Sequence, residues 1–124
     1  EFDIYIVQPD GWYLYNPTEH LLVKKGNTDL RTLACTQKYG QAAPLNLVYV
    51  ADYSRMENAG PEEKQLYAAM DVGFISQNVY LFCASEGLVT VVRASVNKEK
   101  LREKMNLQPE QHILLGQTVG YPAE

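Results

Sequence analysis

The residues of this chain that could carry chemistry are few and scattered. His20 and His112 are the two histidines, and neither lies in a cluster of metal ligands or beside a Gly-x-Ser-x-Gly nucleophile motif. The sequence also lacks the glycine-rich loops that bind nucleotide phosphates. We therefore interpret both histidines as surface or strand-edge residues, and we expect neither a hydrolytic site nor a metal site.

The two cysteines, Cys35 and Cys83, are far apart in the sequence, and their spacing matches no metal-binding pattern. Cys83 lies inside a long apolar stretch, where a cysteine behaves as a small core residue. A chain with two such cysteines fits a reducing compartment. We therefore predict a cytoplasmic protein.

Three polar residues, Asp71, Gln77 and Asn78, interrupt the apolar stretch 66–95. Polar groups on a buried helix face must find partners, or each costs on the order of 1–3 kcal/mol. We favour hydrogen bonds from these side chains to neighbouring backbone, and direct contact with a ligand is the alternative. The same residues divide the stretch, so no apolar run is long enough to span a bilayer.

The element that must position these residues is a helix predicted over residues 61–86. Pro61 suits the first turn of a helix, and Gly87 can take the left-handed conformation that ends one. Apolar residues recur at steps of three and four and also occupy the other sides of the helix. Such a helix is either the central, almost completely buried helix of its domain or is partly buried against a second subunit.

A strand is predicted directly after this helix, over residues 88–95, because the segment is rich in β-branched residues. The turn at Gly87 brings the chain tightly from the helix into the strand. The exit of that strand, at Arg93, Ala94 and Ser95, is therefore the first place where we expect a ligand.

The remaining elements form a simple series. Strands are predicted at 2–7, 12–15, 20–25, 45–51 and 112–119, and shorter helices within 28–39 and over 98–105 with Asn97 as the N-cap. The order predicts a single α+β domain over residues 1–124, with helices on the faces of an antiparallel-rich sheet.

Charge and composition exclude some functions. The net charge is −4 and the isoelectric point is about 5.2, which disfavours nucleic acid as a partner because phosphate binding needs a basic surface. No signal-peptide pattern is present. The chain begins without methionine, directly in a predicted strand, so we expect a processed protein or a fragment.

Several segments together resemble the C-terminal half of the FMN-dependent nitroreductase family, most closely its azoline-oxidising branch. They are DVGFISQNVYLFCASEGL over 71–88, TVVRAS over 90–95, QTVGYP over 117–122, and the upstream segments 2–7, 12–15 and 43–52. The resemblance implies a nitroreductase-like fold that is truncated at its N-terminus. The family's arginine- and serine-rich segment, which holds the flavin phosphate, has no counterpart before Glu1.

The resemblance also implies a binding site for the flavin. The five residues that match the segment along the isoalloxazine ring are Val91, Val92, Arg93, Ala94 and Ser95. A backbone N–H near Ala94 or Ser95 then faces the flavin N5, and no catalytic side chain is required because the cofactor performs the chemistry. NADH or NADPH would be the reductant and a small flat molecule the acceptor.

Members of this family form intertwined homodimers with the flavin at the interface, and the apolar helix over 61–86 agrees with that arrangement. The leading hypothesis is therefore an FMN-dependent oxidoreductase. One alternative is a truncated or degenerate protein that dimerises without binding flavin, and another is an unrelated sensor or interaction domain.

Overall fold

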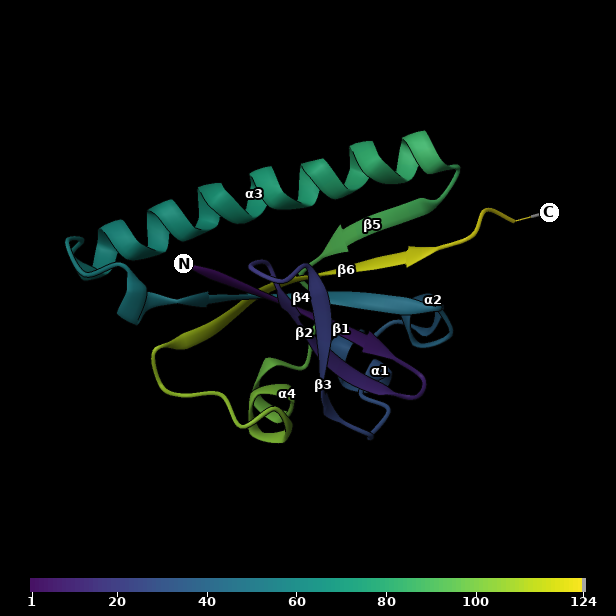
Figure 1. The fold of residues 1–124 in the computed structure, drawn as a ribbon, viewed down its shortest axis with the longest axis horizontal. Helices are drawn as coiled ribbons and strands as arrows, with labels where there is room; N and C mark the ends of the chain where they lie inside the picture. Colours follow the sequence, from purple (N-terminus) through teal and green to yellow (C-terminus); the bar gives the residue numbers. More distant parts are fainter. Residues whose placement is uncertain (124) are drawn as a thin grey trace.

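The computed structural model describes residues 1–123, which form one six-stranded sheet with helices on both sides (Figure 1). The strand order is β3-β2-β1-β4-β6-β5, and every neighbouring pair is antiparallel. The strands are β1 (Phe2–Gln8), β2 (Gly11–Asn16), β3 (Leu21–Gly26), β4 (Leu45–Asp52), β5 (Val89–Arg93) and β6 (Gln111–Gly120). The helices are α1 (Arg31–Ala34), α2 (Lys38–Gln41), α3 (Pro61–Glu86) and α4 (Lys98–Lys104), with a 3-10 turn η1 (Tyr53–Arg55). This architecture confirms the predicted α+β class.

The main hydrophobic core lies between one face of the sheet and the short helices. Alternate residues of the central strands, such as Val7, Val48 and Val50, turn their side chains to this face and are fully buried. Leu101 of α4 and Ala34 of α1 complete the cluster from the helical side. The core therefore forms without α3, which lies on the opposite side of the sheet (Figure 1).

Strand β6 contains a β-bulge. Its register with β4 changes from Tyr49 opposite Leu115 to Val50 opposite Ile113, so Leu114 is an extra residue. The bulge lets Ile113 join the core with α4 while Leu115 faces the side of α3. One strand thus supplies apolar residues to both faces of the sheet.

The ends of α3 agree with their prediction. Pro61 occupies the first turn, and Gly87 has φ +71° and ψ +24°, the left-handed conformation that ends a helix. The N–H of Leu88 bonds back to the carbonyl of Cys83 at 2.8 Å, which directs the chain into β5. Among the helices of residues 1–123, none combines the length and apolar character needed to cross a bilayer.

The burial of α3 differs from the first alternative drawn from the sequence. Only Ala68, Val72, Ser76 and Cys83 are buried, whereas Phe74 is 71% exposed and Leu81 is 60% exposed. Almost complete burial within the domain is therefore wrong, because the sheet covers one narrow side of this helix. Partial burial against a second subunit, the other alternative, stays a prediction.

The segment 28–39 also differs from its prediction of one short helix. It contains the single-turn helix α1 and the beginning of α2, which extends to Gln41, two residues beyond the predicted segment. The N-cap of α1 is Leu30, and the Asp29 carboxylate before it accepts the N–H of Arg31 at 3.0 Å. The carbonyl oxygens of Leu33 and Ala34 accept hydrogen bonds from the N–H of Asn97 and from Arg93 Nη1, so this segment is joined to the chain that follows β5.

Candidate functional site at the exit of β5

Strand β5 lies at one edge of the sheet, paired with β6 on one side and flanked by α3 (Figure 1). The N–H of Val92 points to the outer edge of the strand, where it donates to the Tyr80 hydroxyl of α3 at 2.8 Å. Successive N–H groups of an antiparallel strand alternate between its two edges. The N–H of Ala94, two residues further along, is therefore expected on the same outer edge as that of Val92.

The side chain of Arg93 points into the protein and is only 8% exposed. Its Nη1 donates to the carbonyl oxygen of Ala34 at 2.6 Å and to that of Ser95 at 3.2 Å. Its Nε donates to the Thr118 hydroxyl at 2.9 Å, and its Nη2 to the Asn46 side-chain oxygen at 2.5 Å. Burial lowers the pKa of this guanidinium, which nevertheless stays charged because arginine titrates far above neutral pH.

Ala94 is exposed and Ser95 is half-buried. The Ser95 carbonyl accepts the N–H of Thr36 at 3.1 Å, and its hydroxyl donates to the Gln37 side chain at 2.9 Å. Outside the helices and the strand ladders of residues 1–123, the N–H groups of Ala94 and Ser95 have no acceptor. The strand exit is thus fixed by these contacts and offers the N–H of Ala94 at its outer edge.

A hollow of about 580 Å³ lies beside β5, within the size range of small-molecule sites. Its lining residues come from α2, the loop after it, β5 and the end of β6: Tyr39, Ala42, Ala43, Pro44, Val89, Thr90, Val91, Thr118, Gly120 and Tyr121. Of the five predicted site residues, Val91 alone lines this hollow. The structure thus places Val91 beside the hollow, Val92 at the edge facing α3, Arg93 in the interior, and Ala94 and Ser95 at the exit.

The three polar residues of α3 lie in different environments, and contact with a ligand, the second alternative for them, stays a prediction. Gln77 and Asn78 are exposed, so they need no buried partner. Asn78 lines an apolar groove of about 440 Å³ between α3 and the sheet. Asp71 is half-buried beside Glu1, whose pKa it raises, chiefly through a hydrogen bond between the two carboxyl groups. Hydrogen bonding of these three side chains to neighbouring backbone, the favoured prediction, is not what the structure shows within residues 1–123.

A buried polar link joins the sheet to α3, and the sequence pattern did not reveal it. The Tyr49 hydroxyl donates to Gln117 Oε1 at 2.5 Å, and Gln117 Nε2 donates to the carbonyl of Ser76 at 3.2 Å. Burial raises the pKa of Tyr49 well above its ordinary value, so this phenol stays protonated and can donate. The sequence does not show whether a polar residue in a central strand, such as Gln117, is buried under a helix or faces solvent.

The burial of Cys83 agrees with its interpretation as a core residue, and the exposure of His20 agrees with its interpretation as a surface residue. His20 is exposed, and His112 stacks on Tyr53 with ring centroids 4.2 Å apart at the start of β6. Cys35 and Cys83 are both buried and unpaired, and burial raises the pKa of the Cys83 thiol. Residues 1–123 contain no group of three or more His, Cys, Asp and Glu side chains that could hold a metal ion.

Comparison with known proteins identifies the family. A family model described as "Nitroreductase family" matches residues 1–121. The chain belongs to the nitroreductase family. Its curated relative from Methanocaldococcus jannaschii, named "Putative nitroreductase", is 30% identical over 119 residues. The match covers 93% of this chain and 59% of that relative.

Solved structures show the same nitroreductase fold. A protein of Ralstonia eutropha JMP134, named "putative nitroreductase", superposes with a TM-score of 0.90 at 38% identity over 99% of this chain and 59% of its own. The NADPH:FMN oxidoreductase of Vibrio harveyi, solved with NAD⁺, gives 0.64 at 28% identity over 77% and 45%. The Escherichia coli microcin synthetase complex shares the fold alone, with a TM-score of 0.83 at 18% identity over 99% and 52%.

The chain therefore spans about three fifths of the length of the first two nitroreductases that it matches, 59% in each case. Membership of the family and its fold are shown, as the resemblance implied. Placement in the azoline-oxidising branch stays a prediction.

Proposed function

We propose that the protein is an FMN-dependent oxidoreductase of the nitroreductase type, reduced by NADH or NADPH, which passes electrons to a small, flat acceptor. The observation that supports this most strongly is the rigid exit of β5, where the N–H groups of Ala94 and Ser95 lack acceptors in residues 1–123. A similar protein, the Vibrio harveyi oxidoreductase, is named for its use of NADPH and FMN.

The residues at this exit fit the edge of a flavin ring. Ala94 is exposed and has the smallest side chain that keeps the backbone restricted, so a flat ring can approach its N–H closely. Exposed Val91 adds apolar surface next to the exit. Arg93 is not available to the FMN phosphate, because its donors are used by protein acceptors. Other residues of the protein or of a second subunit must hold that group.

Bound FMN supplies the redox chemistry, because its N5 can take a hydride from the nicotinamide and deliver one to the acceptor. The chain's own contribution is binding and orientation. The N–H of Ala94 or Ser95 donates a hydrogen bond to a ring nitrogen, and the contacts of Arg93 and Gln37 hold the backbone of these two residues in place. No side chain of the exit has to move a proton in this proposal.

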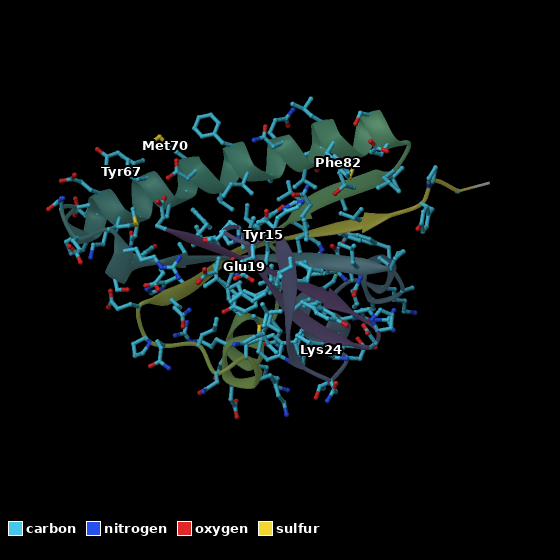
Figure 2. The ribbon with its side chains drawn as sticks, in the orientation of Figure 1. Tyr15, Glu19, Lys24, Tyr67, Met70 and Phe82 are labelled. Atoms are coloured by element: carbon cyan, nitrogen blue, oxygen red, sulfur yellow. The ribbon has the colours of Figure 1, made fainter. Side chains whose placement is uncertain are left out.

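We further propose that two copies of the chain associate through α3. Its outer face carries Leu66, Tyr67, Met70, Phe74 and Leu81, all exposed in the single chain, and exposed Phe82 lines the groove between α3 and the sheet. Figure 2 shows Tyr67 and Met70 pointing away from the sheet. Apolar patches of this extent on a protein surface mark interaction sites. A second copy of α3 matches the patch because it is equally apolar, and the buried, reduced cysteines fit a cytoplasmic dimer.

The spectrum of the purified full-length protein tests the proposed function. We expect a yellow protein whose visible flavin absorption bleaches on anaerobic addition of NADH or NADPH and returns with an electron acceptor. Chromatography of the cofactor released by denaturation should identify FMN. A colourless dimer that takes up no added FMN would instead support the alternative of a degenerate, non-catalytic protein.

A further inference from the structure

Arg93 is an unusual residue for the interior of this protein, because its charge has no opposite charge beside it. The four groups that accept its hydrogen bonds are the carbonyls of Ala34 and Ser95, the Asn46 amide and the Thr118 hydroxyl. All four are neutral. Among residues 1–123, no carboxylate lies within 4 Å of this guanidinium.

The guanidinium of Arg93 is closely packed by neighbouring residues. Arg93 lies across Gly116 of β6, where an added Cβ would be only 2.6 Å from Nη1. The Thr118 hydroxyl that accepts from Arg93 also donates to Asn46 Oδ1 at 2.6 Å, and Asn46 Nδ2 donates to the carbonyl of Gly40 at 2.8 Å. The charge is thus held in one position by a network that includes β4, β6 and the α2 segment.

The location of the charge connects it with the proposed flavin edge. Nη1 is 3.2 Å from the carbonyl oxygen of Ser95, so the charge lies against the backbone of the exit, whose outer edge offers the N–H of Ala94. A buried charge acts over a longer range than an exposed one, because little water screens it. A buried cation without a partner favours negative charge in its neighbourhood.

We propose that Arg93 is a positioning residue with an electrostatic role: it fixes the exit of β5 and makes a bound FMN easier to reduce. This inference depends on the proposed function. Reduction adds electron density and, near neutral pH, negative charge to the flavin ring. The unneutralised charge of Arg93 therefore stabilises the reduced ring more than the oxidised ring, which raises the reduction potential of the bound cofactor.

The test measures the midpoint potential of FMN in the full-length holoprotein by equilibration with redox dyes. Arg93→Met removes the charge and keeps much of the length of the side chain. We expect the preference for reduced over oxidised FMN to fall at least tenfold, which corresponds to a potential about 30 mV more negative for a two-electron couple. Arg93→Lys retains the charge, so its preference should stay within about threefold of the original protein.

A second variant separates charge from structure. Asn46→Asp places a carboxylate at the atom that accepts from Nη2, so it neutralises Arg93 without removing it. We expect the potential to shift in the same direction as in Arg93→Met. The matched control is Arg102→Met, because Arg102 also donates to two backbone carbonyls, those of Gln108 and Gln111, but lies on α4. Its potential should be unchanged.

The outcomes distinguish this inference from the proposed function. FMN binding by all proteins with an unchanged potential in Asn46→Asp, or with equal shifts in Arg93→Lys and Arg93→Met, would overturn the electrostatic role alone. If Arg93→Met does not fold, Asn46→Asp and Arg93→Lys decide the question. An original protein that binds no FMN would overturn the proposed function and this inference together.

Discussion

At the scale of single residues, the side chains least open to substitution are buried polar groups that are hydrogen-bonded to one another. Tyr49 and Gln117 are both fully buried and are joined by a hydrogen bond. Removal of one partner leaves the other in an apolar environment without compensation. Because Gln117 also donates to the carbonyl of Ser76 in α3, loss of the Tyr49 hydroxyl would weaken the packing of the sheet against that helix.

Tyr49→Phe tests this constraint. The change removes only the hydroxyl and leaves Gln117 Oε1 without its donor, so we expect the free energy of unfolding to fall by about 1–3 kcal/mol. Urea denaturation followed by circular dichroism measures the effect. The control is Tyr15→Phe, whose hydroxyl bonds to His20 in an exposed position and should change stability by less than about 0.5 kcal/mol. Equal effects in the two variants would contradict the buried link.

Ala94→Pro tests the backbone donor at the strand exit. Proline removes the N–H of residue 94, and the extended conformation of Arg93 is one that a following proline allows. We expect a loss of FMN affinity of about threefold to tenfold, the value of one hydrogen bond. Ala94→Ser retains the N–H and should bind FMN as the original protein does. Fluorescence titration measures both affinities, and an unaltered affinity in Ala94→Pro would exclude the Ala94 N–H as a ligand.

Residues with a local signal were predictable from the sequence, and residues defined by long-range partners were not. Gly87 and the N-cap Asn97 both have the predicted geometry, because caps depend on neighbours within one turn. Arg93 and Val91 share one face of β5, yet the charged residue is buried and the apolar residue is exposed. The alternation of apolar and polar residues in the sequence cannot show that Arg93 is buried, because its burial depends on hydrogen bonds to Asn46 and Thr118 from other strands.

At the scale of elements, the turn from α3 into β5 determines where the candidate site lies. Gly87 has a positive φ, and a Cβ added at this position would meet no atom within 4 Å. The cost of a side chain there is therefore purely conformational. Gly87→Ala should lower the free energy of unfolding by about 1–2 kcal/mol. Gly87→Asn should cost less, because asparagine tolerates the left-handed region. Thermal or urea denaturation compares the two, and a larger loss for asparagine would contradict this explanation.

Long elements with regular patterns were predicted well. The bounds of α3 are those expected, because Pro61 and Gly87 define both ends. The segment 28–39 was not resolved into its single-turn helices, since one turn is too short to show a helical period. Strand boundaries differed by one or two residues, as in β5, which ends at Arg93 while the prediction extended to Ser95.

At the scale of the whole molecule, the sequence predicted the fold class and family but neither the strand order nor the open face of α3. Strand order depends on pairing between distant segments, such as β4 between β1 and β6. The apolar residues on all sides of α3 predicted that two surfaces pack against this helix, and the single chain provides only one of them, the sheet. In the proposed dimer, α3 of a second copy of the chain covers this exposed side.

Phe74→Asp tests whether that cover is a second copy of the chain. Phe74 is the most exposed apolar residue of α3, so a charge there should convert the dimer into a monomer at micromolar concentration. Sedimentation velocity at several concentrations measures the change. The control is Leu22→Asp, which places the same charge on an exposed apolar residue of β3, at the other edge of the sheet. A dimer that survives Phe74→Asp, or dissociates in Leu22→Asp, would place the interface elsewhere.

The bulge at Leu114 has a consequence for how this chain can change in length. Residues on either side of it serve different layers, Ile113 the core beside α4 and Gln117 the link to α3. Because Leu114 is the extra residue, its deletion would leave Ile113 and Leu115 as neighbours in a regular strand, with their side chains still on opposite layers. We therefore expect β6 to tolerate both varied side chains and the loss of one residue at 114, whereas the loss of a paired residue far from the bulge, such as Thr118, would turn the rest of the strand to the opposite layer.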